Sequence, residues 1–94
     1  MTGSPKEKAD VLKACVIIPT YNNAATLATV IEDVIQYSNH VIVINDGSTD
    51  NTVDIVNKYP AVQFISYPKN VGKGWALRKA FAYATAQGYK YAIS

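Results

Sequence analysis

The sequence predicts an α/β fold with an open, mostly parallel twisted sheet and alternating helices. Four short runs of apolar, largely β-branched residues alternate along the 94-residue chain with three stretches in which apolar residues recur every three or four positions. Runs of the first kind are typical of strands buried on both faces, and stretches of the second kind are typical of amphipathic helices. Because a helix separates each strand from the next, we expect parallel pairing through right-handed crossovers.

The first strand and helix are expected between residues 14 and 37. Residues 14–18 (Ala-Cys-Val-Ile-Ile) form a continuous apolar run that Pro19 closes. From Thr26 the apolar positions follow a helical period instead, and the predicted helix ends near Tyr37. The apolar stripe of this helix comprises Leu27, Val30, Ile31, Val34 and Ile35.

The middle of the chain repeats this order. Residues 41–44 (Val-Ile-Val-Ile) predict a second strand, and the Asn-Asp-Gly-Ser sequence that follows is a strong turn signal. Either Asp50 or Ser48 is expected to cap the next helix, which Pro60 ends. The apolar positions of that helix are Val53, Val56 and Ile55.

The last third of the chain predicts a strand at 62–67, a helix that ends at Gly88, and a short fourth strand at 91–94. We expect this last strand to be interrupted, because four residues are fewer than usual. The domain organisation is therefore a polar N-terminal extension, residues 1–13, followed by one truncated domain, residues 14–94. The third helix is expected to present Leu77, Ala80, Phe81 and Ala84 on one face.

Composition limits the class of protein. Hydrophobic residues make up 49% of the chain and charged residues 17%, so the chain should build a core. A net charge of +2 without a long basic run gives no reason to expect a nucleic-acid partner. We expect no secretory signal, because the first ten residues are polar and charged. No apolar run approaches the roughly 18 residues of a membrane span. The single cysteine, Cys15, is interpreted as a buried thiol. These features predict a cytoplasmic protein.

Three loops that each follow a strand carry the candidate binding groups, because ligands of such sheets bind outside the carboxyl ends of the strands. The first loop contains Tyr21, whose ring can stack on a base, and the second contains Asp46, whose carboxylate can accept a hydrogen bond from a base or ribose. The third places Lys73 between two glycines at the start of a helix, where backbone N–H groups and the helix dipole favour a phosphate.

Each group also has a plain structural interpretation. Tyr21 alone could pack on its neighbours, Asp46 could belong to an ordinary turn, and Lys73 or Arg78 could be a solvated surface residue. Their joint occurrence at one edge of the sheet favours a site. A P-loop is excluded because Tyr67 stands where it needs Gly, and the Rossmann Gly-x-Gly-x-x-Gly is missing after the first strand.

Taken together, the three loops and their flanking strands resemble family 2 glycosyltransferases of the GT-A fold, in order and spacing. The matching segments are Val-Ile-Ile-Pro-Thr-Tyr-Asn-Asn (16–23), Val-Ile-Val-Ile-Asn-Asp-Gly-Ser-Thr-Asp-Asn-Thr (41–52) and Asn-Val-Gly-Lys-Gly-Trp-Ala (70–76). The likeness covers residues 14–94, the nucleotide-binding half of that fold. The Asn-x-Gly-Lys-Gly form is similar to polyprenyl-phosphate sugar transferases of the dolichyl-phosphate mannose or glucose synthase type.

This resemblance implies a UDP- or GDP-sugar donor. It implies that Asp46 hydrogen-bonds the base, and that Lys73 and Arg78 lie near the base, ribose or diphosphate. Asn23 stands where the family usually has Glu, which removes a charge near the donor. The residues that would line the base pocket are Pro19, Thr20 and Tyr21.

The resemblance also implies a divalent cation, Mg²⁺ or Mn²⁺, held by an Asp-x-Asp motif, and a catalytic carboxylate, both after Ser94. Neither the metal ligands nor the catalytic residue is therefore expected within this chain, which should bind nucleotide weakly and transfer no sugar. In the full-length protein the acceptor would be a polyprenyl phosphate, and the enzyme would be peripheral to a membrane.

Two rival classes are left open. One is a non-catalytic receiver-like module with Asp46 as the phosphate acceptor, although the first loop offers Asn22 and Asn23 instead of the usual acids. The other is a nucleotidyltransferase, although no Gly occurs from Ile18 to Ala25. In every case an unpaired last strand predicts self-association through the sheet edge.

Overall fold

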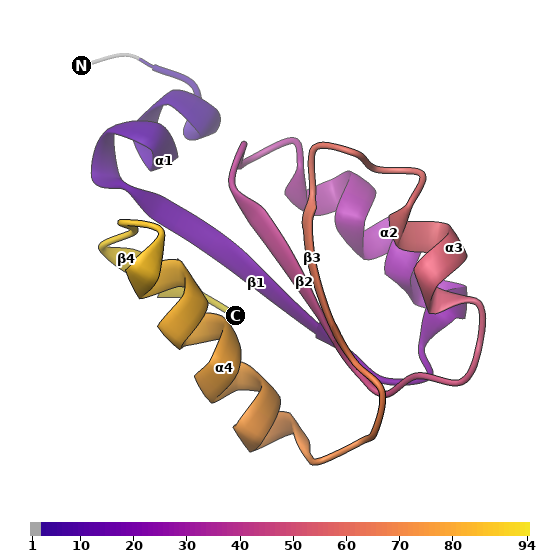
Figure 1. The fold of residues 1–94 in the computed structure, drawn as a ribbon. Helices are drawn as coiled ribbons and strands as arrows, with labels where there is room; N and C mark the ends of the chain where they lie inside the picture. Colours follow the sequence, from indigo (N-terminus) through magenta and orange to yellow (C-terminus); the bar gives the residue numbers. More distant parts are fainter. Residues whose placement is uncertain (1–2) are drawn as a thin grey trace.

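The computed structural model describes residues 3–94, which form a four-stranded sheet with the strand order β3-β2-β1-β4 (Figure 1). All three strand pairs are parallel, as the alternation of strands and helices predicts. The sheet is therefore open and parallel, and the expected fold class is confirmed. The strands are β1 (Ala14–Thr20), β2 (Val41–Asp46), β3 (Gln63–Tyr67) and β4 (Tyr91–Ile93).

Helices cover both faces of this sheet. α2 (Ala24–Val34) and α3 (Thr52–Val56) lie on one face, and α4 (Lys73–Ala86) lies on the other (Figure 1). None of the helices between residues 3 and 94 is long and apolar enough to cross a membrane. The layered arrangement brings the carboxyl ends of β1, β2 and β3 together at one edge of the molecule.

Within residues 3–94, two apolar clusters form the core, one on each side of the sheet. The cluster under α4 contains Cys15, whose side chain is fully buried, as predicted, and burial raises the pKa of this thiol. The second cluster lies between the sheet and α2 and α3. β2 contributes to both, because all six of its residues are buried. This is the burial expected for a central parallel strand.

Residues 5–12 form a helix, α1 (Pro5–Leu12), where only a polar extension was expected. Ser4 and Glu7 form a capping box: the Glu7 N–H donates to Ser4 Oγ, and the Ser4 N–H donates to a carboxylate oxygen of Glu7. Pro5 occupies the first helical position, where its missing N–H costs nothing. The sequence Ser-Pro-Lys-Glu was therefore a start signal for a helix.

β1 continues through Pro19 to Thr20, two residues beyond the predicted end. The Val16 N–H donates to the His40 carbonyl, on the β2 side of the strand. Backbone groups alternate sides along a strand, so Pro19 faces the β4 side. There β4 pairs only with residues 14–16. The absent N–H of Pro19 therefore interrupts no ladder bond among the described residues.

Three residues assigned to apolar helix faces are exposed instead, namely Val30, Val53 and Phe81. In α4 the contact with the sheet is made by the small side chains of Ala76, Ala80 and Ala84, which are spaced by four residues. Their size lets the helix approach the sheet closely, and Phe81 lies about a quarter turn away from that line. Helix α2 also ends at Val34, earlier than expected, with turn hydrogen bonds continuing to Ser38.

Candidate ligand-binding site

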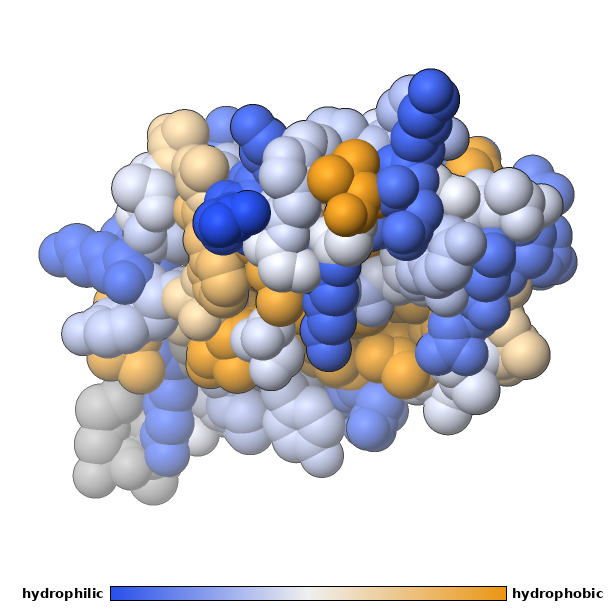
Figure 2. Space-filling view, turned by 90° about the horizontal axis from the view of Figure 1, so that it is seen from below, coloured by the Kyte–Doolittle hydropathy of each residue, from blue (hydrophilic) through white to orange (hydrophobic). Residues whose placement is uncertain are grey.

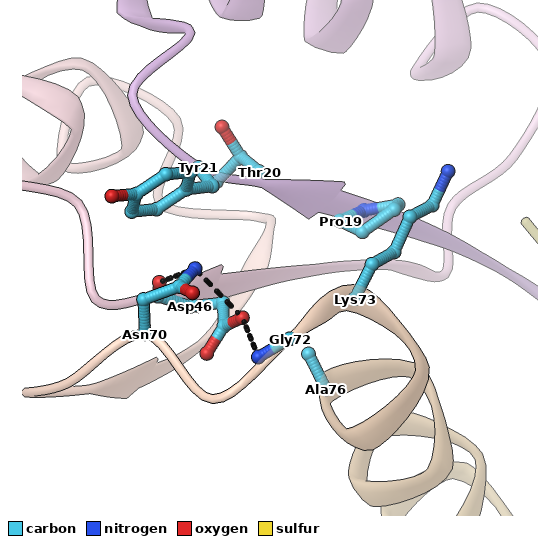
Figure 3. A pocket seen from close by; sticks show the side chains of 8 residues that line it. All are labelled: Pro19, Thr20, Tyr21, Asp46, Asn70, Gly72, Lys73 and Ala76. Atoms are coloured by element: carbon cyan, nitrogen blue, oxygen red, sulfur yellow. Dashed lines mark hydrogen bonds between the residues drawn. The ribbon is translucent and has the colours of Figure 1, made fainter.

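A pocket of about 280 Å³ opens at the carboxyl ends of β1 and β2, beside the start of α4. It lies at the edge where the strand-to-helix loops converge, as expected for an open parallel sheet. Figure 2 looks at the molecule from below, toward these strand ends, and shows hydrophobic surface between hydrophilic side chains. The pocket is lined by Pro19, Thr20, Tyr21, Asp46, Asn70, Gly72, Lys73 and Ala76 (Figure 3).

The end of β1 forms one wall. The Tyr21 side chain is half exposed and lies across the pocket from Asp46 and Asn70 (Figure 3). Thr20 is 6% exposed, and its hydroxyl has no hydrogen-bond partner among the described residues. This hydroxyl is buried and points away from Asp46 in Figure 3. The accessible groups of this wall are thus the aromatic ring of Tyr21 and the apolar ring of Pro19.

Asp46 forms the opposite wall and is 4% exposed. Its Oδ1 accepts a hydrogen bond from the Val71 N–H (3.0 Å), and its Oδ2 accepts one from the Gly72 N–H (2.8 Å). The Asn70 side-chain amide donates to Oδ2 and to the Asp46 carbonyl, both at 3.1 Å. The carboxylate therefore binds the loop that leads into α4.

Gly47 allows this loop to come close. Its φ is +75°, and a Cβ at this position would lie 2.3 Å from the backbone nitrogen of Asn70 and 2.5 Å from the carbonyl carbon of Lys69. Any side chain would collide with backbone, which cannot give way as a flexible side chain can. The turn after β2 and the loop after β3 are thus packed backbone against backbone.

A second set of hydrogen bonds joins the turn after β2 to the loop after β1. Asn22, which has a positive φ of 48°, donates its N–H to Ser48 Oγ (2.9 Å) and accepts from the Thr49 N–H through its side chain (2.8 Å). Ser48 therefore binds the first loop and does not cap α3, contrary to one of the two capping predictions.

Asp50 contacts the start of α3 but does not occupy the N-cap position, which is Asn51 and has no side-chain cap bond, so the other capping prediction also places the cap one residue too early. Its carboxylate accepts from the N–H and hydroxyl of Thr52, and from the N–H of Ala24 at the start of α2 (3.1 Å). The Thr52 hydroxyl bond, aided by the Ala24 and Thr52 backbone bonds, holds the pKa of Asp50 below its ordinary value. One carboxylate thus joins the amino ends of two helices.

Lys73 lies at the amino end of α4 and is exposed. Its side chain extends from α4 toward Pro19 in Figure 3, and both residues line the pocket. The first turn of this helix contains no acidic residue, but the Asp46 carboxylate accepts a hydrogen bond from the N-cap residue Gly72 and so offsets part of the positive end of the helix dipole. A lysine and a helix amino end side by side form a favourable environment for an anion.

The described geometry agrees with a family comparison. The model of the family "Glycosyl transferase family 2" matches residues 15–93. The chain belongs to glycosyl transferase family 2. The structural neighbour glucosyl-3-phosphoglycerate synthase of M. tuberculosis superposes with a TM-score of 0.66 at 25% identity, over 87% of this chain and 35% of that one.

Curated relatives of this family 2 chain include enzymes with named activities. It is 31% identical over 77 residues to the dolichyl-phosphate beta-glucosyltransferase ALG5C of Trichomonas vaginalis, covering 66% of this chain and 23% of the relative. It is 29% identical over 82 residues to the dolichyl-phosphate beta-glucosyltransferase of Saccharomyces cerevisiae, covering 70% and 25%. It is 38% identical over 88 residues to the uncharacterized glycosyltransferase YaiP of Escherichia coli, covering 85% and 22%. The chain thus spans about a quarter of the length of these relatives.

Five of the seven residues singled out from the sequence of this family 2 chain line the pocket; these are Pro19, Thr20, Tyr21, Asp46 and Lys73. Asn23 does not line it; it precedes α2 as its N-cap residue and is exposed. Arg78 is exposed on α4 and does not line it either. Sequence reasoning did not single out the other three lining residues, Asn70, Gly72 and Ala76. The hydrogen bonds between Asn70 and Asp46 could not be expected from a local sequence pattern, because the two residues are 24 positions apart.

The residues described here do not form a metal site by themselves. Between residues 3 and 94, no group of three or more His, Cys, Asp or Glu side chains is arranged to hold a metal ion. Asp46, the carboxylate in the pocket, is committed to backbone N–H groups. The groups that line the pocket are an aromatic ring at Tyr21, polar side chains at Asp46 and Asn70, and a positive charge at Lys73.

Proposed function

We propose that this chain is the donor-nucleotide half of a glycosyltransferase, and that its pocket binds the nucleoside diphosphate of a UDP- or GDP-sugar. The observation that carries the proposal is the combination of Tyr21, Asp46 and Lys73 around one pocket at the strand ends. An aromatic ring suits a base, and a lysine at a helix amino end suits a diphosphate. Pro19 adds apolar surface beside the ring.

Within this proposal each group has a distinct task. The base stacks on Tyr21, in the space between that ring and Asp46. Its polar edge reaches the free lone pair of Asp46 Oδ1 or the Asn70 side chain. The diphosphate lies toward Lys73, which neutralises part of its charge as a point charge on a flexible stem. Arg78, one turn further along α4, would reach the phosphates or sugar only from outside the pocket.

The full-length protein would transfer the sugar to an acceptor, and we propose a polyprenyl phosphate. The named activities of the Trichomonas and yeast relatives support this acceptor class. A divalent cation, Mg²⁺ or Mn²⁺, would neutralise the departing diphosphate, bound by carboxylates other than those described here. An acceptor embedded in a membrane agrees with the proposed location, a cytoplasmic protein peripheral to the bilayer.

A receiver-like module is less compatible with this geometry. A phosphate-accepting carboxylate must meet its phosphoryl donor from solvent, but Asp46 is buried and both its oxygens accept hydrogen bonds from the neighbouring loop. Phosphorylation there would require that loop to leave.

Titration of the chain with UDP, GDP and their sugars, followed by NMR and calorimetry, tests the nucleotide proposal. We expect Lys73→Ala to weaken UDP or GDP binding about tenfold, which corresponds to about 1.4 kcal/mol, and to leave uridine or guanosine binding unchanged. Lys58→Ala, at an exposed position after α3, serves as the matched control and should change neither. A folded wild-type chain that binds none of these nucleotides would rule out the proposal.

Self-association through the sheet edge is a separate proposal. β4 is an edge strand of three residues, and its Tyr91 and Ile93 side chains are 58% and 59% exposed. A second copy could pair with this edge, since exposed strand edges offer unpaired backbone groups.

A further inference from the structure

Asp46 has little capacity left for a ligand. A carboxylate offers about four acceptor positions. Oδ2 accepts from the Gly72 N–H and from the Asn70 amide, and Oδ1 accepts from the Val71 N–H. At most one position on Oδ1 therefore remains for a base. Most of the hydrogen bonding of this buried carboxylate is directed at the loop between β3 and α4.

The bonds from Asp46 fix three consecutive residues at the entrance to α4. Gly72 precedes Lys73 directly and is the N-cap residue of the helix. Its φ of 130° is a backbone conformation that glycine adopts readily. Because glycine also adopts many other conformations, Gly72 does not fix the path of the backbone by itself. External hydrogen bonds are needed to hold such a segment in one conformation. Asp46 supplies two of them to backbone N–H groups.

The same contacts orient the Asn70 side chain. Both groups that its Nδ2 contacts, the Asp46 carbonyl and Asp46 Oδ2, are acceptors. Reversing the amide would place oxygen against oxygen, so the NH₂ end is held on Asp46 and the Oδ1 end is left available. Asn70 thus offers a fixed acceptor to the pocket that it lines.

We propose that Asp46 is a positioning residue: it holds residues 70–72 so that Lys73 and the start of α4 face the bound diphosphate. This inference rests on the proposed nucleotide function and assigns Asp46 a task beyond contact with the base. A base contact affects only ligands that carry a base. A positioning residue affects every ligand that uses the phosphate end of the pocket, including one with no base.

Inorganic pyrophosphate is therefore the decisive probe, compared with UDP, GDP and uridine. Asp46→Asn keeps one acceptor oxygen and turns an NH₂ donor toward either the Val71 or the Gly72 N–H. We expect solvent exchange of these two amide protons, measured by NMR, to become at least tenfold faster. We also expect the affinities for pyrophosphate, UDP and GDP to fall together by at least tenfold.

Asp54→Asn, the same change at an exposed position of α3, should alter none of these values. Asn70→Ala provides a second variant, because the Asn70 residue is exposed and its loss is tolerated more readily than a change at buried Asp46. It should accelerate the same exchange and weaken pyrophosphate about threefold. Correct folding of each variant is checked by the remaining amide resonances.

Two results would overturn the positioning role. One is unchanged exchange at Val71 and Gly72 in folded Asp46→Asn and Asn70→Ala. The other is a loss of affinity confined to ligands with a base, while pyrophosphate binds as before, which would make Asp46 a base contact only. If the wild-type chain binds no nucleotide at all, the proposed function fails, and the exchange rates still decide whether Asp46 holds the loop.

Discussion

Replacing Gly47 with alanine should destabilise the chain far more than a single added methyl group suggests. The new Cβ would lie 2.3 Å from the Asn70 nitrogen and 2.5 Å from the Lys69 carbonyl carbon, so the loop after β3 has to move. That movement lengthens the bonds from Val71 and Gly72 to Asp46, now 3.0 and 2.8 Å. A buried carboxylate then loses part of its hydrogen bonding.

The expected loss of stability has two parts. A non-glycine residue at φ +75° costs about 1 kcal/mol. Losing one hydrogen bond to a charged group costs roughly a further 2 kcal/mol. The sum of about 3 kcal/mol is a large share of the 5–15 kcal/mol typical of small domains. It should lower the melting temperature by at least about 12 °C for a domain of this size.

Two other glycines serve as controls: Gly88 has a positive φ without a backbone collision, and Gly74 has neither. Gly88 has φ +92° and no atom within 4 Å of the point where a Cβ would lie, so Gly88→Ala should cost only the backbone part, about 1 kcal/mol. Gly74 is the second residue of α4, also with no atom within 4 Å, and Gly74→Ala should stabilise by no more than about 0.5 kcal/mol. Urea unfolding followed by circular dichroism measures all three. Equal losses for Gly47→Ala and Gly88→Ala would refute the importance of the backbone collision.

Two further predictions concern Asp50 and the sheet edge. The pKa of Asp50 is lowered in the folded chain, chiefly by the hydrogen bond from the Thr52 hydroxyl, so the ionised carboxylate favours folding. This stabilisation is present above about pH 3.9, the ordinary Asp pKa. It is lost as the pH falls through the lower pKa of the folded chain. Asp50→Asn should therefore reduce the dependence of the urea midpoint on pH on the acid side, and an unchanged dependence would contradict it. Ile93→Lys should shift any self-associated chain toward monomer in light scattering, because it puts a charge on the exposed edge strand β4, whereas Val71→Lys, an equally exposed apolar position away from that edge, should not.

The sheet and its helix order were predictable because continuous apolar runs mark the strands, whereas apolar residues spaced by three or four positions mark the helices. β2 is apolar in four consecutive positions and lies in the centre of the sheet, where both faces are covered. The boundaries were less predictable, since they depend on neighbours: Pro19 fits within β1 only because its β4 side has no ladder bond to lose. The exposure of Phe81 likewise depends on how closely the alanines of α4 let that helix approach the sheet.

Within the candidate site, the loops were predictable but their mutual contacts were not. Strand ends gave the location of Tyr21, Asp46 and Lys73, which line one pocket. The bonds from residues 70–72 to Asp46 join positions 24 to 26 residues apart, and no local pattern encodes them. The close approach at Gly47 was hidden for the same reason, since Asp-Gly is also an ordinary turn sequence. The roles of all these residues toward a ligand remain predictions.

The turn after β2 shows why a motif can identify a family without identifying a substrate. Asn45 bonds Ser66, Asp46 bonds the loop into α4, Ser48 bonds the loop after β1, and Asp50 joins α2 to α3. Most of the polar capacity of this turn is therefore used to hold three loops in register around the pocket. A sequence match at this turn therefore indicates that the loops around the pocket are held in the same arrangement, and it does not identify the ligand. The choice of base and sugar has to come from groups with free hydrogen-bonding capacity or free surface, such as the ring of Tyr21, and from residues outside this chain.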